Sequence, residues 1–139
     1  MTTNYAVGQC DQRPWGRWEV VAVGPGYAVK RIIVSPGHRL SLQRHQFRAE
    51  HWFVVAGFGQ VTRNGEIISL ARGQHTMIGI GDAHRIANPG PTELIFVEVQ
   101  HGGILDENDI ERLEDDYDRS GIGLTTAAHK ANRIGIAGE

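Results

Sequence analysis

Four polar residues whose side chains can bind metals lie in two stretches of the chain. Gln43, His45 and Glu50 fall in the first stretch, and His84 falls in the second. Gln43 and His45 are two residues apart, so their side chains point to the same side of an extended strand. Neutral imidazoles and a carboxylate suit a borderline or hard divalent ion such as Zn²⁺, Mn²⁺, Fe²⁺ or Ni²⁺. The residue types and their spacing therefore predict a divalent-metal site where the two stretches meet.

Short β-prone segments separated by turn signals must position these ligands. One expected strand ends near residue 23. The others run over 27–34, 39–43, 51–55, 60–63, 66–70, 76–80, 83–87 and 93–99. The Asn64-Gly65 pair predicts a hairpin with a type I′ turn, because both residues tolerate positive φ. Turn signals recur every 6–12 residues, and no helical segment separates the strands. This pattern predicts an all-β sandwich or barrel rather than a βαβ fold.

The periodicity changes after the last expected strand. Within residues 106–117, Ile110, Leu113 and Tyr117 recur at the spacing of one helical stripe. Asp106 is placed to cap such a helix, and the acidic start suits the helix dipole. We therefore expect a short C-terminal helix over 106–117.

The length and composition indicate one domain. The chain has 139 residues, of which 40% are hydrophobic and 22% are charged, as in ordinary soluble globular proteins. We expect this domain over residues 1–119, including the short helix. Residues 120–139 are small, polar and rich in glycine, and we expect them to form a flexible tail or an arm on a neighbouring subunit.

Charge and apolar runs argue against several kinds of partner. A net charge of −2 does not provide the basic face that nucleic-acid binding usually needs. The chain has no run of about 18 apolar residues, so we expect no membrane partner. Cys10 is the single cysteine, and the first residues lack the pattern of a secretion signal. Together these features predict a cytoplasmic protein.

Two motifs in the chain resemble those of the cupin superfamily. The first cupin motif runs from a glycine through histidines and a glutamate to a second glycine, and its counterparts here are Gly37, His45, Glu50 and Gly57. The second motif runs from glycine through Pro-x-Gly and histidine to asparagine, and its counterparts are Gly73, Gly79 (at the proline position), Gly81, His84 and Asn88. Two motifs in the right order on an all-β background form a specific signal. The resemblance implies the double-stranded β-helix, or jelly-roll barrel, of the cupins.

Longer segments resemble the type II phosphomannose isomerase cupin, the C-terminal module of bifunctional mannose-1-phosphate guanylyltransferase/phosphomannose isomerase enzymes. These segments are RPWG (13–16), VKRIIVSPG (29–37), LSLQRH (40–45), RAEHW (48–52), HRIANPG (84–90), VEVQHG (97–102) and ENDIERLEDDY (107–117). The likeness spans residues 12–119 and implies a metal-dependent interconversion of mannose 6-phosphate and fructose 6-phosphate. The Gly-rich phosphate-cradling motif of a nucleotidyltransferase is absent from this sequence.

Phe47 departs from the family pattern, which has a second histidine at this position. A phenyl ring cannot bind a metal, so two outcomes stay open. The site can use Gln43, His45, Glu50 and His84, because type I phosphomannose isomerases are similar in using a Gln-x-His pair. Alternatively, the metal is weak or absent and the protein is a non-catalytic sugar-binding cupin. We favour the first outcome, with Zn²⁺ as the first choice of ion and Mn²⁺, Fe²⁺, Ni²⁺ and Co²⁺ as alternatives.

Aldose–ketose isomerisation needs a base that moves a proton between C1 and C2. His51, Glu98 and Lys30 are the catalytic candidates in the family-like segments. A metal would stabilise the carbonyl oxygen as a Lewis acid. An iron-type cupin oxygenase is a third hypothesis, since a facial triad of ligands leaves coordination positions open on the metal.

The substrate of such an enzyme is a small sugar phosphate. Its phosphate needs cationic donors, and Arg48, Arg85 and Arg112 lie in family-like segments. Gln100 follows the last expected strand and is a candidate for binding sugar hydroxyls. Because cupins commonly pair through sheet edges, we expect a homodimer.

Overall fold

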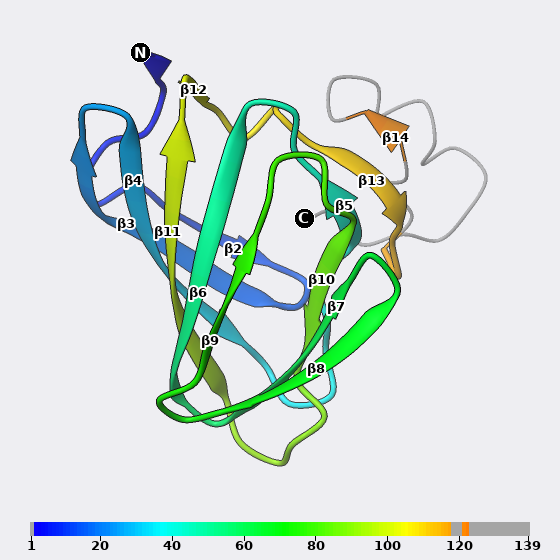
Figure 1. Ribbon diagram of the computed structural model, residues 1–139. Helices are drawn as coiled ribbons and strands as arrows, with labels where there is room; N and C mark the ends of the chain where they lie inside the picture. The colour runs from blue at the N-terminus through cyan, green and yellow to red at the C-terminus, as the bar shows by residue number, and fades with distance from the viewer. Residues whose placement is uncertain (1, 118–120, 123–139) are drawn as a thin grey trace.

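The computed structural model describes residues 2–117 and 121–122, and all its regular elements are strands (Figure 1). These strands are β1 (Thr2–Thr3), β2 (Cys10–Arg13), β3 (Gly16–Gly24), β4 (Tyr27–Val34), β5 (Leu42–Arg44), β6 (Arg48–Ala56), β7 (Phe58–Arg63), β8 (Glu66–Ala71), β9 (His75–Ile78), β10 (His84–Ala87), β11 (Leu94–Gly102), β12 (Ile104–Leu105), β13 (Glu111–Glu114) and β14 (Gly121–Ile122). The prediction of an all-β chain is confirmed.

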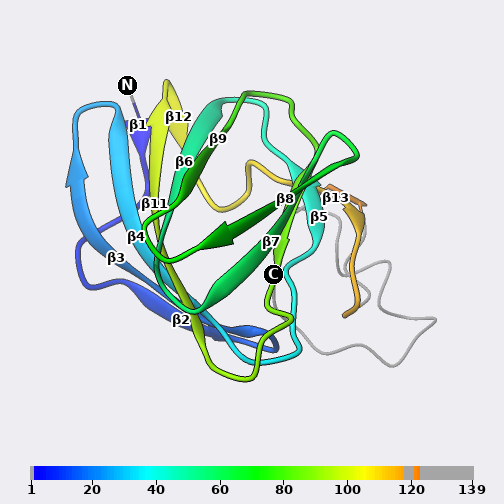
Figure 2. The ribbon, with the colours of Figure 1, turned by 60° about the horizontal axis from the view of Figure 1, so that its bottom comes forward.

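Two six-stranded antiparallel sheets face each other and enclose the core (Figures 1 and 2). One sheet has the order β2-β3-β4-β11-β6-β9, and the other has the order β14-β13-β5-β10-β7-β8. β1 pairs in parallel with β12 and joins the start of the chain to the end of the barrel strands. Neighbouring strands are often distant in sequence, so the interior collects side chains from the whole domain.

The β7–β8 hairpin confirms the turn predicted at Asn64-Gly65. The φ angles of these residues are 48° and 83°, the positive values that a type I′ turn requires. The hairpin register brings Arg63 opposite Glu66, directly across the turn. Local turn chemistry therefore accounts for the formation of this hairpin.

Alternation along the strands decides which side chains enter the barrel. On β6 the buried residues are Arg48, Glu50, Trp52 and Val54, and each intervening residue faces outward. The buried residues of β11 are Leu94, Phe96, Glu98 and Gln100, and those of β4 include Ala28, Lys30, Ile32 and Val34. The interior is thus polar at one end of these strands and apolar at the other.

The short helix predicted over residues 106–117 is wrong, because the described residues contain no helix. A turn closes where the Asp109 N–H donates to the Asp106 carbonyl at 3.1 Å, and β13 follows it. β13 pairs with β5, and its Glu111 bonds Arg44 on that strand. The helical stripe also fails because Leu113 is 36% exposed. An available strand partner in the sheet therefore overrides the local helical pattern.

The flexible tail predicted over residues 120–139 lies mostly outside the described residues. Within it, Gly121–Ile122 forms β14 and pairs with β13. The flexibility of the remaining tail stays a prediction.

Candidate metal centre

His45, Glu50 and His84 converge inside one end of the barrel. His45 follows β5, Glu50 lies on β6 and His84 begins β10. One ligand atom from each of the three lies within 4.8 Å of the other two. The Nε2 atom of His45 is 3.3 Å from Glu50 Oε2, and the Nε2 atom of His84 is 3.8 Å from Glu50 Oε1. We call these three buried residues the ligand cluster.

Backbone carbonyls orient both imidazole rings of the ligand cluster. His45 Nδ1 is 2.6 Å from the Asp109 carbonyl oxygen, and His84 Nδ1 is 2.8 Å from the Asp82 carbonyl oxygen. A carbonyl oxygen can only accept a hydrogen bond, so each Nδ1 must carry the proton. The Nε2 lone pairs therefore face Glu50. This is the usual outer-shell arrangement of metal-binding histidines, and the residues present fit a divalent ion.

The protonation states in the ligand cluster also suit metal binding. Burial lowers the pKa of His45 to about 3, and the positive charge of Arg48 adds to this shift. The imidazole is therefore neutral at neutral pH. Burial alone would raise the pKa of Glu50, but its electrostatic interactions with the adjacent His45 and the charged Arg48 bring it well below its ordinary value. A neutral imidazole and an ionised carboxylate are the forms that bind metals.

Gln43 lies beside the ligand cluster, at the position predicted for a fourth ligand. It pairs in register with His84, and both line a small interior cavity together with Glu50. Its Nε2 atom donates to the Ser41 hydroxyl at 3.0 Å and to the Ser41 carbonyl at 3.3 Å. Since the amide nitrogen is the donor there, the amide oxygen is the atom that could bind an ion.

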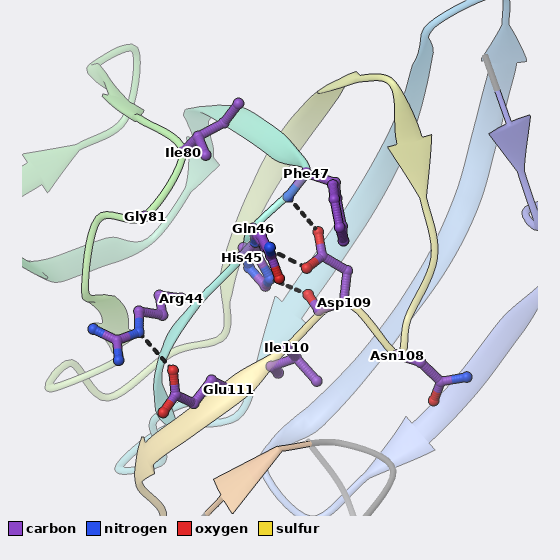
Figure 3. Close-up of a pocket in the computed structure, with 10 residues that line it drawn as sticks. All are labelled: Arg44, His45, Gln46, Phe47, Ile80, Gly81, Asn108, Asp109, Ile110 and Glu111. Atoms are coloured by element: carbon purple, nitrogen blue, oxygen red, sulfur yellow. Dashed lines mark hydrogen bonds and ion pairs between the residues drawn. The ribbon is translucent and has the colours of Figure 1, made fainter.

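Phe47 lines a cavity at the mouth of the barrel and is 41% exposed. This cavity has a volume of about 520 Å³, and its lining residues are Arg44, His45, Gln46, Phe47, Ile80, Gly81, Asn108, Asp109, Ile110 and Glu111 (Figure 3). We call it the mouth cavity. His45 is the member of the ligand cluster that borders the mouth cavity, so the cavity gives access to the cluster from that side.

Arg48 places a positive charge against the ligand cluster. Its Nε donates to Glu50 Oε2 at 2.8 Å, and its Nη2 lies 3.4 Å from His45 Nε2. Its Nη1 donates to the Asp106 carbonyl oxygen at 3.0 Å. The sequence predicted phosphate binding for Arg48, but its guanidinium group is buried beside the candidate ligands. An incoming cation would have to compete with this guanidinium group for the lone pair of His45.

Glu98 and Gln100 extend the polar interior away from the ligand cluster. Glu98 accepts hydrogen bonds from Trp52 Nε1 at 3.1 Å and from Gln100 Nε2 at 2.7 Å. Burial raises the pKa of Glu98 well above its ordinary value, and the negative charge of Glu50 raises it further. Glu98 is therefore a buried carboxylic acid that keeps its proton beside an ionised carboxylate.

Lys30 is fixed in an ion pair next to this acid. Its Nζ donates to Glu107 Oε2 at 2.6 Å and lies 4.1 Å from the ring centre of Trp18. Although burial lowers the pKa of Lys30, the opposite charge of Glu107 raises it above its ordinary value. The amine therefore stays protonated and does not have the form of a base.

The structure does not bring every predicted site residue to the ligand cluster. His51 lies on the outer face of β6, and its Nε2 is 2.8 Å from Nδ1 of His75. The guanidinium group of Arg85 bonds the Leu40 carbonyl and Glu114, while Arg112 lies on β13 opposite Gln43.

The acidic residues that follow β12 have a role that the sequence pattern does not reveal. Glu107 pairs with Lys30, and Asp109 bonds the segment that carries His45. Their acidic run instead predicted the start of a short helix. The matching basic and amide groups are far away in sequence, so no local signal identifies this role.

Comparison with known proteins gives a family model and close relatives. The family model described as "Mannose-6-phosphate isomerase C-terminal" matches residues 2–115. The alginate biosynthesis protein AlgA of Pseudomonas aeruginosa is 52% identical over 108 residues, which are 78% of this chain and 22% of that protein. A mannose-1-phosphate guanylyltransferase of Klebsiella pneumoniae is 49% identical over 107 residues, which are 77% of this chain and 23% of the relative. The chain thus spans less than a quarter of these relatives' length.

Solved structures share the fold at low sequence identity. The capsular polysaccharide assembling protein CapF of Staphylococcus aureus has a TM-score of 0.66 and 24% identity, over 76% of this chain and 34% of that chain. The cupin domain of Schizosaccharomyces pombe Cnp3 has a TM-score of 0.60 and 12% identity, over 63% and 64% of the two chains. These likenesses confirm the cupin fold. Among the residues described, no helix has the length and apolar character needed to span a bilayer.

Proposed function

The chain belongs to the family of mannose-6-phosphate isomerase C-terminal domains, and we propose that it is a metal-dependent sugar-phosphate isomerase interconverting mannose 6-phosphate and fructose 6-phosphate. The observation that carries the proposal is the convergence of His45, Glu50 and His84 from three places in the chain. Both rings are fixed with Nε2 toward the carboxylate. A buried carboxylate facing two oriented imidazoles is a donor set that suits a divalent cation.

We propose Zn²⁺ as the ion, held by the ligand cluster and the amide oxygen of Gln43. Mn²⁺, Fe²⁺, Ni²⁺ and Co²⁺ suit the same donor types. A bound ion would supply Lewis-acid polarisation of the substrate carbonyl. The pattern of two imidazoles, a carboxylate and an amide contains no thiolate, so the donor set does not discriminate strongly between these metals.

The remaining chemistry of the isomerisation is proton transfer, and we propose an indirect part in it for Glu98. Glu98 lines the interior cavity with Glu50 and does not line the mouth cavity, so it would exchange a proton with the ligand cluster and not with the sugar itself. Of the three candidates, His51 faces outward and Lys30 is held protonated by Glu107. Glu98 keeps a proton beside Glu50 because burial raises its pKa. A carboxyl group with a raised pKa holds a proton that it can donate, as general acid catalysis requires.

The sugar phosphate would enter through the mouth cavity. Its volume of about 520 Å³ falls within the usual range for small-molecule sites. The interior cavity beside Gln43 and Glu50 has only about 10 Å³, so the body of a hexose phosphate must stay at the mouth. His45 borders the mouth cavity and would therefore face the reactive end of the sugar.

A non-catalytic sugar-binding cupin is the second candidate. It is favoured by Phe47, which stands where the family has a histidine, and by Arg48, whose Nη2 lies 3.4 Å from His45 Nε2. A cation already beside the candidate ligands reduces the attraction for a metal ion. The mouth cavity would then hold a sugar without any chemistry following.

Metal analysis followed by a coupled assay separates the two candidates. We expect the purified protein to contain about one divalent ion per chain, and to release fructose 6-phosphate from mannose 6-phosphate. Chelation should remove the activity, and Zn²⁺ or another ion of the proposed set should restore it. Protein that binds mannose 6-phosphate but contains no metal and has no turnover with any of these ions would be the sugar-binding cupin instead.

A further inference from the structure

A short acidic segment crosses the mouth of the barrel beside the ligand cluster. Residues 106–111 run from the end of β12 to the first residue of β13, and we call them the mouth strap (Figures 1 and 3). The strap carries Asp106, whose carbonyl oxygen accepts from Arg48, and Glu107, which pairs with Lys30. These contacts hold the mouth strap against the side chains of Arg48 and Lys30 in the barrel interior.

Asp109 of the mouth strap makes three hydrogen bonds with three consecutive residues (Figure 3). Its Oδ1 accepts from the Gln46 N–H at 2.8 Å, and its Oδ2 accepts from the Phe47 N–H at 2.9 Å. Its backbone carbonyl oxygen accepts from His45 Nδ1 at 2.6 Å. One residue therefore binds both the loop that carries His45 and the ring of His45 itself.

The geometry of these bonds couples the carboxylate of Asp109 to the tautomer of His45. Two amide donors held by both oxygens of one carboxylate fix its position, and such charge-assisted bonds are stronger than neutral ones. The Asp109 carbonyl is then held against His45 Nδ1, which must keep its proton there. His45 Nε2 is consequently the unprotonated nitrogen, and it faces Glu50 at 3.3 Å.

We propose that Asp109 is the positioning residue for His45, acting from the mouth strap to keep this ligand in its metal-binding tautomer. The role in ion binding rests on the proposed function, whereas the control of the tautomer does not. Glu111 offers a matched control on the same strap, because its carboxylate pairs with the exposed Arg44.

Nitrogen NMR of the metal-free protein tests the tautomer directly. In the parent protein and in Glu111→Gln we expect His45 protonated at Nδ1 at neutral pH. In Asp109→Ala the two amides lose their acceptor and the carbonyl can move away, so we expect a substantial population protonated at Nε2. Asp109→Asn keeps one side-chain oxygen that can accept from an amide, so we expect its tautomer population to lie between those of the parent and Asp109→Ala. This variant provides the test if Asp109→Ala does not fold. An unchanged Nδ1–H tautomer in the folded variants would overturn the proposal.

Titration with Co²⁺, followed by its visible absorbance, tests the consequence for ion binding. Loss of an outer-shell partner typically weakens metal affinity about 10- to 100-fold. We expect Asp109→Ala to show a loss of this size, Asp109→Asn a smaller loss, and Glu111→Gln an affinity within about twofold of the parent. If every chain fails to bind Co²⁺ while the tautomer still shifts in Asp109→Ala, the positioning role stands and the proposed function fails. If Asp109→Ala binds Co²⁺ as tightly as the parent, Asp109 does not position the ligand.

Discussion

The two ends of the barrel interior are built from the same strands but by different chemistry. At one end, Val54 pairs with Phe96, and Phe96 pairs with Ile32, so three buried apolar side chains form a row. Four residues further toward the mouth, Glu50 pairs across the sheet with Gln100. The apolar end needs only shape and volume to pack, whereas every polar group at the mouth end needs a partner.

Trp52 lies at the boundary between the two ends and serves both. Its ring packs at 5.2 Å from the ring of Phe96, and its indole N–H lies within hydrogen-bond distance of both Glu50 and Glu98. The difference between the ends indicates that the two halves of each strand have different roles. The apolar end stabilises the fold, while the mouth end keeps charged groups buried in positions that suit an ion.

The largest effect is expected for Leu94→Ala at the apolar end. Leu94 is fully buried, and removing its side chain leaves a cavity, so the free energy of unfolding should fall by about 3 kcal/mol. Denaturant unfolding measures this change. Leu94→Met keeps the volume and is the control, with an expected loss below about 1.5 kcal/mol. A folded Leu94→Ala protein should bind Co²⁺ like the parent, and a strong loss of affinity would contradict the division between the two ends.

His84→Ala at the mouth end should instead remove metal binding. Losing one of the three members of the ligand cluster should weaken Zn²⁺ or Co²⁺ affinity at least about 100-fold, which is roughly 2.7 kcal/mol. Isothermal titration with the metal measures it, and the isomerase assay should lose all activity. Full turnover by this variant would exclude His84 from the ligands.

Glu107→Gln tests whether ion pairing stabilises the mouth end. Burial alone would raise the pKa of Glu107, but Lys30 and Arg48 lower it from 4.5 to about 2. Because the folded pKa is lower than the unfolded one, the stabilisation is present above pH 4.5 and is lost as the pH falls toward 2. We expect Glu107→Gln to cost about 2 kcal/mol at neutral pH.

The pH dependence provides the control for this charge effect. The difference in unfolding free energy between the parent and Glu107→Gln should shrink steadily as the pH falls through this window. Unfolding by urea at a series of pH values measures the difference. A difference that is constant from neutral pH to acid would show that the carboxylate contributes through packing and not through its charge.

Phe47→His is expected to have the smallest effect of the four. It restores the histidine of the family pattern next to the ligand cluster, and we expect metal affinity to rise about tenfold, or roughly 1.4 kcal/mol. Competition titration with a chelator measures this gain. Phe47→Leu is the matched control without a ligand atom. Equal affinities for the histidine and leucine variants would mean that position 47 serves only the mouth cavity.

Much of the fold could be predicted because it depends on local patterns. Alternating residues and the Asn64-Gly65 pair locate the strands and one hairpin without knowledge of the partner strands. The motif spacing also brings His45 and Glu50 into consideration together, and the structure places both in the ligand cluster. The same alternation could have excluded His51, since a neighbour of inward Glu50 on a strand must point outward.

The polar network could not be predicted because its pairs are distant in sequence. From the sequence alone Lys30 looks like an ordinary surface charge, but in the structure it pairs with Glu107. Arg48 looks like a phosphate ligand, but its Nε lies 2.8 Å from Glu50 Oε2. The apolar stripe at Ile110 resembles a helix because nothing local reveals that β5 will offer a strand partner. Contacts between residues that are distant in the chain decide these cases, and local sequence patterns do not reveal such contacts.

The mouth strap is fastened by the very start of the chain. Asn4 donates to Asp106, and Tyr5 bonds Glu107, each across a separation of 102 residues. Contacts between such distant residues form late, because a long loop must close before they are made. The barrel can therefore assemble first, and its opening is finished only when the two ends of the domain meet. A protease that trims the first few residues would leave the two six-stranded sheets intact and loosen the segment that orients His45.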